Sequence, residues 1–358
     1  MPLHQPRFLA TGIGSMPFTD IEHAVEVSLT RLPMAPFWPQ LPKINLNEQM
    51  EIQYSEGIPC SVIDEEKKRL YIDTSGDYSE SFAQFYEAYM SAMDPDTGNG
   101  DCSALAISET FSRGIYALER RLQRRTEKLA FVKVQTTGPC SFSLTIVDEN
   151  KRAIYYNEEF RDVIIKALAM KCRWQIQKFQ PYAEKVICFI DEPILSAFGS
   201  STYVSVKRDD VVAHLAEMVD AIHTDNAIAG VHCCGNTDWS ILIDAGVDLV
   251  NFDAFEYGET IALYSEAVKA HLQRGGGLAW GVVPTSTAVR EQSVESLSTH
   301  LEKMMNHLAA QGIDKGLIVD QAVISPSCGT GSMDPMDAEK VFELTNQLSA
   351  AMRQQYGF

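Results

Sequence analysis

The sequence predicts a single (β/α)8 barrel, the TIM-barrel class of α/β fold, over residues 1–358. Short apolar runs typical of buried parallel strands alternate with amphipathic helical stretches along the whole chain. Repeated strand–helix alternation is the signature of this barrel. No Gly/Ser linker or low-complexity tract divides the chain, and barrels of this length often fold as one unit.

Eight apolar runs are the predicted strands, because each is short and bounded by turn-forming or polar residues. They cover residues 8–13, 35–40, 130–135, 186–191, 228–232, 248–252, 278–283 and 317–324. Apolar residues spaced three or four apart predict helices between the strands. These helices cover residues 21–31, 103–127, 156–179, 211–223, 293–311 and 337–355.

The second and third predicted strands are about 90 residues apart, which is far more than one connecting helix needs. We interpret residues 42–100 as an insertion over one face of the barrel, and not as a second domain. Within it, the sequence CSVIDEEKKRLYI at residues 60–72 predicts a β-hairpin.

The formal net charge of −18 argues against nucleic acid as a partner, because phosphate binding needs clustered Lys and Arg. It also argues against an anionic membrane surface. No run of about 18 apolar residues predicts a membrane span, and residues 1–15 lack a signal-peptide core. Eight cysteines in so long a chain do not form a secreted disulfide framework. We therefore expect a cytoplasmic protein.

Candidate metal ligands follow the fifth and eighth predicted strands, at the end where a barrel builds its active site. His232 and Cys234 point the same way on an extended segment, while Cys233 points to the wall. Cys328 follows the eighth strand within Ser-Pro-Ser-Cys-Gly. One imidazole and two thiolates suit Zn²⁺, and three ligands leave a position open for substrate. Buried cysteines are ordinarily small apolar residues, and this interpretation applies to Cys60, Cys102, Cys140, Cys172 and Cys188.

The pattern His232-x-Cys234 with the distant Cys328 resembles the zinc motif of cobalamin-independent methionine synthase. The catalytic half of that enzyme is a (β/α)8 barrel of about this length. Thr-Gly-Ile-Gly-Ser at residues 11–15 is similar to the Ile-Gly-Ser stretch of the family, and Asp-Glu-Pro at residues 191–193 is similar to a second segment. Thr-Gly-Pro at residues 137–139 resembles a further turn at the barrel rim.

The resemblance implies roles for the residues in these segments. Ile13, Gly14 and Ser15 would hold the carboxylate and amino group of a homocysteine-like thiol. Asp191, beside Glu192, would meet the substrate ammonium. Zinc coordination deprotonates a thiol, so the implied activity is methyl transfer to a thiol, which converts homocysteine to methionine. The residues alone leave Asp191 an alternative role, capping the next helix.

Two departures from the family bear on the methyl donor and the metal. The folate-dependent enzymes carry a second, N-terminal barrel for which this chain has no room, so methyltetrahydrofolate and a methylcorrinoid protein both remain candidate donors. The family's fourth zinc ligand is a glutamate after the sixth strand, where this chain offers Asp253 or Glu256. Trp38 either stacks under the donor or is a core aromatic.

His-Cys-Cys-Gly-Asn-Thr at residues 232–237 also resembles the zinc methyltransferases of uroporphyrinogen decarboxylase-like barrels, which methylate thiols such as coenzyme M. A metal-free decarboxylase of that kind is a further alternative. It needs N-terminal arginines for propionate groups, and only Arg7 and Arg31 precede the second strand. A barrel that binds a ligand without catalysis is the remaining alternative.

Overall fold

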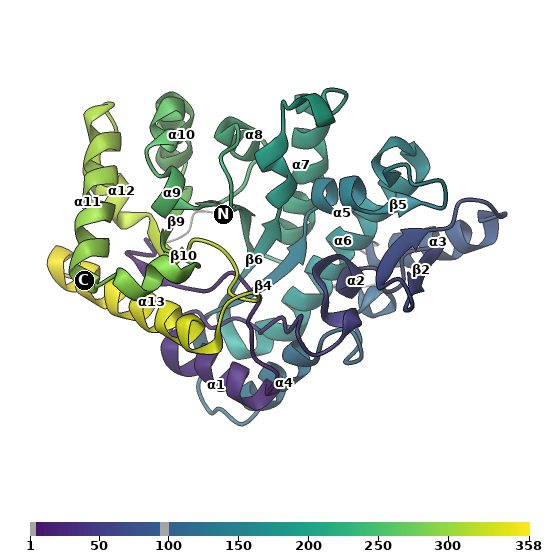
Figure 1. Cartoon of the computed structure of the whole chain (residues 1–358), viewed down its shortest axis with the longest axis horizontal. Helices are drawn as coiled ribbons and strands as arrows, with labels where there is room; N and C mark the ends of the chain where they lie inside the picture. The colour runs from purple at the N-terminus through teal and green to yellow at the C-terminus, as the bar shows by residue number, and fades with distance from the viewer. Residues whose placement is uncertain (1–4, 94–99) are drawn as a thin grey trace.

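A curled sheet of seven parallel strands forms the centre of the molecule, with helices around it (Figure 1). The computed structural model describes residues 5–93 and 100–358. The strand order is β1-β10-β9-β8-β7-β6-β4. These strands are β1 (Leu9–Ala10), β4 (Leu129–Thr137), β6 (Ala183–Asp191), β7 (Ile228–Cys233), β8 (Leu249–Phe252), β9 (Gly277–Val283) and β10 (Ala322–Pro326). The predicted α/β class with parallel strands is confirmed.

The helices between the strands follow the predicted amphipathic stretches. Helix α1 begins and ends where the sequence predicts, and Asp20 caps it by accepting a hydrogen bond from the amide of His23. The predicted helix over residues 103–127 is shorter in the structure, where this range contains a 3-10 turn at Ser103–Leu105 and the helix α4 at Arg113–Leu122. The α-helices are α1 (Ile21–Arg31), α2 (Met50–Tyr54), α3 (Ser79–Met93), α4 (Arg113–Leu122), α5 (Pro139–Thr145), α6 (Glu158–Phe179), α7 (Arg208–Thr224), α8 (Trp239–Asp244), α9 (Ala254–Tyr257), α10 (Ser265–Gln273), α11 (Val294–Ala310), α12 (Lys315–Asp320) and α13 (Pro335–Tyr356).

Two predicted strands differ in the structure. Residues 317–320 of the predicted eighth strand belong to α12, because Asp314 caps that helix through the amide of Gly316. The strand itself begins only at Ala322. Residues 35–40 form no regular strand but only isolated bridges, from Phe37 to β4 and from Gln40 to Ser15. Pro36 and Pro39 lie in this segment and lack the amide N–H that a continuous ladder needs.

Residues 34–40 nevertheless form backbone hydrogen bonds to the edge strand β4 and to residues that follow β1. On one side, β4 amides donate to the carbonyls of Met34 at 3.1 Å and Pro36 at 2.8 Å. On the other side, the amide of Gln40 donates to Gly14 at 3.0 Å, and its carbonyl accepts from Met16 at 2.8 Å. The segment therefore lies between β4 and the residues that follow β1.

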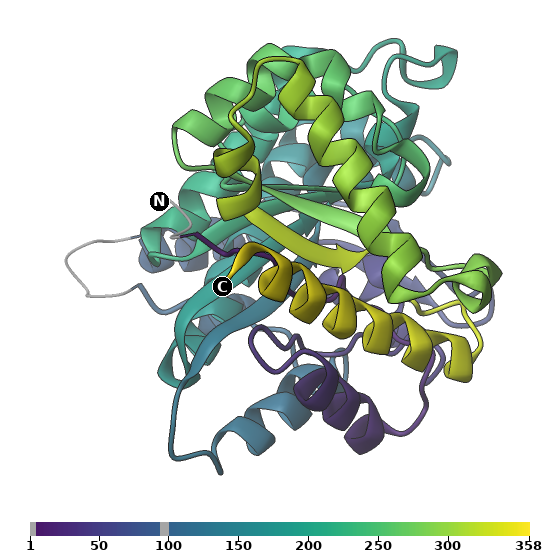
Figure 2. The same ribbon diagram turned by 90° about the vertical axis from the view of Figure 1, so that its left-hand side faces the viewer.

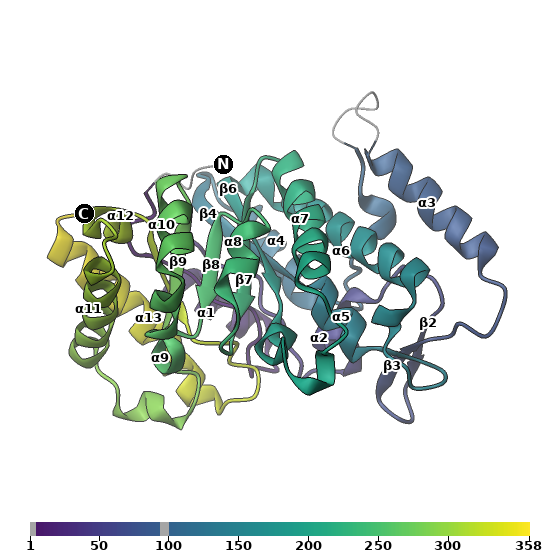
Figure 3. The ribbon, with the colours of Figure 1, turned by 90° about the horizontal axis from the view of Figure 1, so that it is seen from above.

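The predicted hairpin within residues 42–100 is present. Strands β2 (Ser61–Asp64) and β3 (Arg69–Ile72) pair antiparallel, and β5 (Val147–Asp148) adds a parallel third strand to this small sheet. Figure 3 shows this sheet and α3 at the opposite end of the molecule from α11 and α13. Residues 94–99 of the predicted insertion lie outside the described residues.

An apolar cluster of side chains lines the inner face of the large sheet. Alternate strand residues point inward, and the inner cluster consists of Leu9, Ile13, Ala35, Ile187, Phe189, Ile228, Leu249, Ala279 and Val323. Helices cover the outer face, where α13 lies beside α1 (Figure 2). None of the helices in the described ranges has the length and apolar composition that crossing a membrane requires. Beyond this apolar cluster, at the carboxyl ends of the strands, polar side chains point inward.

Candidate metal centre

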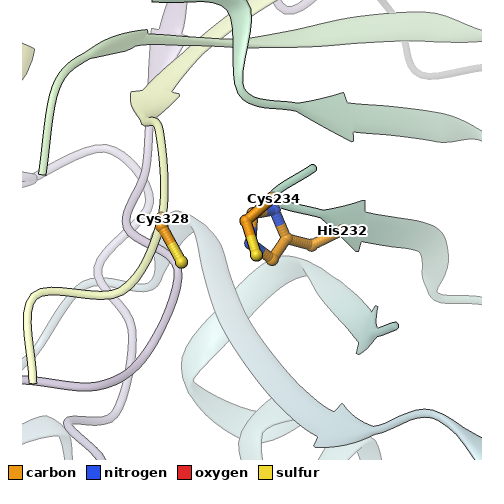
Figure 4. A group of neighbouring side chains, drawn as sticks. All are labelled: His232, Cys234 and Cys328. Atoms are coloured by element: carbon orange, nitrogen blue, oxygen red, sulfur yellow. The ribbon is translucent and has the colours of Figure 1, made fainter. Parts of the chain in front are cut away.

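His232, Cys234 and Cys328 lie together at the carboxyl end of the sheet. Their ligand atoms are all within 4.8 Å of one another. Figure 4 shows the Cys328 side chain reaching toward Cys234 and His232 from the opposite segment. His232 is in β7 and Cys234 follows that strand directly, while Cys328 follows β10. The three predicted ligands can therefore hold one metal ion.

The orientation of His232 leaves one ring nitrogen free. Its Nδ1 lies 2.5 Å from Oδ1 of Asn251, the residue opposite it on β8. The Asn251 amide group donates to the carbonyl of Ala279 and to Oγ of Ser325, both at 2.8 Å. Because these bonds direct the Asn251 oxygen to the imidazole, the proton of neutral His232 belongs on Nδ1. The buried Nε2 has no hydrogen-bond partner, as expected of a nitrogen that binds a metal.

The two thiols differ in acidity because they are neighbours. The Cys328 thiol and His232 lower the pKa of Cys234 to about 4. The Cys234 thiolate in turn raises the pKa of Cys328. Burial lowers the pKa of His232, but the neighbouring Cys234 and Asp191 outweigh that effect and the net shift is upward. These neighbours therefore favour ionisation of Cys234 over Cys328, and a bound cation would favour ionisation of the second thiol.

The two acids predicted as a fourth ligand do not join this cluster. Asp253 caps α9 by accepting a hydrogen bond from the amide of Glu256 at 3.0 Å. Burial raises the pKa of Asp253 to about 6, and the nearby Cys234 adds to the shift. The Glu256 side chain is exposed. Cys233 is fully buried in the outer core, so it faces the wall as predicted.

The predicted substrate loop at residues 13–15 lies against the loop that carries Cys328. The carbonyl of Ser15 accepts from the amide of Thr330 at 2.8 Å, and Oγ of Ser15 accepts from the amide of Gly331 at 3.3 Å. A Cβ at Gly329 would lie 2.1 Å from Ser15 Oγ, so the serine hydroxyl would have to move to admit a larger residue there. Ser15 therefore lies next to the segment that begins at Cys328.

A buried lysine that the sequence analysis did not identify binds the backbone of this loop. Lys133 of β4 donates to the carbonyl of Ile13 and, at 3.1 Å, to Oε1 of Gln135. Its Nζ also lies 4.8 Å from the ring centroid of Phe189. Burial lowers its pKa to about 8. The side chain of Gln135 approaches Gly14 so closely that a Cβ there would lie 2.9 Å from its Nε2.

Asp191 and Glu192 point to opposite sides of β6. Asp191 lies opposite His232 in the register, and its Oδ1 is buried without a hydrogen-bond partner. Burial raises its pKa to about 6, against the lowering effect of Lys133 and His232. The Glu192 carboxylate instead accepts from the amides of Cys140 and Ser141 at the start of α5, at 2.8 and 2.7 Å. The structure thus brings Asp191, but not Glu192, to the cluster.

Trp38 is part of the core in this structure. Its side chain is fully buried, and its indole N–H donates to Oε1 of Gln175 in α6 at 2.8 Å. The ring has no exposed face on which a methyl donor could stack. Of the two roles that its sequence allows, the core role is the one that these contacts fit.

The sequence contains a signal by which Asn251 and Lys133 could have been identified as candidate site residues. Both are polar residues inside otherwise apolar strands, in the sequences LVNF and AFVKVQ. A polar group in such a position is costly unless it has partners, which makes it a candidate for a structural or functional contact.

Comparisons with known proteins add no relative. No model of a protein family matches the chain, and a search of curated proteins found no similar sequence. A functional assignment therefore depends on the residues and geometry of the metal centre itself.

Proposed function

We propose that this protein is a zinc-dependent methyltransferase that methylates the sulfur of a small thiol, with a homocysteine-like amino-acid thiol as acceptor. The methyl donor is methylcobalamin on a corrinoid protein or methyltetrahydrofolate. The observation that carries the proposal is the unpartnered Nε2 of His232, which lies near the two thiols of Cys234 and Cys328. The other ring nitrogen, Nδ1, is held by Asn251. A nitrogen and two sulfurs are a donor set that suits zinc over the harder cations.

His232, Cys234 and Cys328 would hold the ion, which would supply a deprotonated and oriented substrate sulfur. Asp191 would bind the substrate ammonium, since its free carboxylate oxygen lies beside His232 in the strand register. Ser15 would meet the substrate carboxylate from the neighbouring loop. In the reaction a sulfur lone pair forms the new S–CH3 bond, the donor leaves with the electrons of its broken bond to methyl, and the thiol proton goes to solvent.

We also propose that residues 34–40 serve as an eighth, irregular strand, so that the sheet closes into a barrel. Their backbone hydrogen bonds to β4 and to the residues after β1 support this closure. Closure would enclose the inward side chains of the strand ends in one site. All eight cysteines are free thiols in the structure, in keeping with the proposed location in a reducing cytoplasm.

The proposal predicts methionine as the product when zinc-loaded protein is mixed with homocysteine and a donor. The measurement is end-point mass spectrometry with methylcobalamin and with methyltetrahydrofolate, and coenzyme M serves as the alternative acceptor. Cys234→Ala should abolish turnover, while Cys233→Ala, the neighbouring thiol that faces the wall, should retain it. The absence of methylated product with every donor and acceptor pair, from protein that contains zinc, would reject the activity.

A further inference from the structure

Three neighbouring strands end in polar atoms that have no partner. Thr137 on β4 lies opposite Asp191 on β6, and Asp191 lies opposite His232 on β7. Thr137 Oγ1, Asp191 Oδ1 and His232 Nε2 are all buried without a hydrogen bond. Polar atoms are rarely left so in a folded protein unless a ligand, an ion or water completes them.

The Thr137 hydroxyl belongs to the inner face of the sheet. Phe131 packs against the inner apolar cluster, and Lys133 lies over the inner residue Phe189. Since strand residues two apart share a face, Thr137 also points inward and Thr136 points outward. Both threonines are fully buried and both hydroxyls lack a partner. The difference between them is the face of the sheet on which each one lies.

The ammonium group of Lys133 is not bonded to the carboxylate of Asp191. Its hydrogen bonds go to the carbonyl of Ile13 and to Gln135, and no ion pair joins it to Asp191 within the described part of the chain. Oδ1 of Asp191 and the hydroxyl of Thr137 are therefore available to a ligand that lies beside His232. An anionic substrate group there would face the carboxylate at short range, whereas a cationic group with several N–H donors would satisfy both oxygens.

We infer that Thr137 is a specificity-determining residue whose hydroxyl, together with Asp191, receives the primary ammonium group of the thiol substrate. The inference deepens the proposed function and rests on it. It names the substrate class as thiols that carry a primary amine, such as α-amino-acid thiols. Thiols with a sulfonate in that position are disfavoured, because the sulfonate would lie against Asp191.

The test compares Thr137→Val with Thr136→Val, two isosteric changes that each remove one buried hydroxyl from adjacent residues. Calorimetry on zinc-loaded protein measures the affinity for homocysteine and for 4-mercaptobutanoate, its analogue without the amine. We expect Thr137→Val to weaken homocysteine binding roughly tenfold or more, the scale of a hydrogen bond to a charged group. Its affinity for 4-mercaptobutanoate should stay unchanged, and Thr136→Val should bind both thiols as the original protein does.

Equal loss for both thiols in Thr137→Val, no loss for either, or the same loss in Thr136→Val would overturn the role of Thr137. A failure of the proposed function looks different, because then neither thiol binds to the unmodified zinc-loaded protein. Circular dichroism of both variants shows whether a loss reflects unfolding.

Discussion

At the scale of single residues, Asn251 determines which nitrogen of His232 can bind a metal. Its two amide protons are used by Ala279 and Ser325, so its oxygen must face Nδ1 of the imidazole. Partners of this kind fix the tautomer and the ring orientation of a metal-binding histidine. The metal centre thus depends on a side chain that is not itself a ligand.

Asn251→Ala should weaken zinc binding by about 10- to 100-fold, the range for loss of such a partner. Competition with a chromophoric chelator measures the affinity. Asn306→Ala, which removes an exposed amide from α11, should leave the affinity unchanged. An Asn251→Ala protein that is folded and holds zinc as tightly as the original would show that the tautomer is set in another way.

The sequence predicts the three ligands but not their supports. The alternation of His232, Cys233 and Cys234 is a local pattern, and the distant Cys328 occupies an equivalent strand end. Asn251 and Thr137 owe their importance to the register between neighbouring strands, which no single segment contains.

At the scale of elements, Glu192 shows how a strand end is tied to the helix that follows another strand. Its buried carboxylate binds the first turn of α5, and a Cβ at Gly138 would lie 2.2 Å from its Cδ. Burial raises the pKa of Glu192 to about 7, although its hydrogen bonds to Ser141 and Cys140 act in the opposite direction. We therefore expect the charge of this carboxyl group to change with pH near neutrality.

This shift predicts a pH-dependent stability difference between the protein and Glu192→Gln. An acid whose folded-state pKa is raised binds more protons folded than unfolded, so its contribution falls as the pH rises from about 4.5 to about 7. The free energy of unfolding of the original protein relative to Glu192→Gln should fall by up to about 3 kcal/mol between pH 4.5 and pH 8.

Urea unfolding followed by circular dichroism at several pH values measures this difference. Glu158→Gln, at an exposed position of α6, controls for the loss of one carboxyl group. A difference that does not change with pH would mean that Glu192 is ionised as readily in the folded protein as in the unfolded chain.

The elements that the sequence predicts least well are those with mixed signals. Residues 317–320 are as apolar as a strand, but the cap at Asp314 makes them helical. Residues 35–40 are apolar as well, but their two prolines prevent a regular ladder. Runs without prolines or caps, such as those that form β4, β6 and β9, match their predicted positions within a few residues.

At the scale of the whole molecule, the curled parallel sheet brings residues that are almost 100 positions apart to one end of the strands. Cys234 and Cys328 follow β7 and β10, which β8 and β9 separate in the sheet order. The α/β class follows from strand–helix alternation, which the sequence contains. The contact across the sheet between the two cysteines depends on its curl, which periodicity alone does not determine.

The most direct test of the central claim is zinc-edge X-ray absorption on the purified protein, with and without homocysteine. The proposal predicts about one zinc per chain, with one nitrogen and two sulfur ligands from the protein and a third sulfur after homocysteine is added. In Cys328→Ser one protein sulfur should be lost, whereas Cys233→Ser should keep both. A protein that binds no zinc, or a zinc shell unchanged by Cys328→Ser, would contradict the proposed centre.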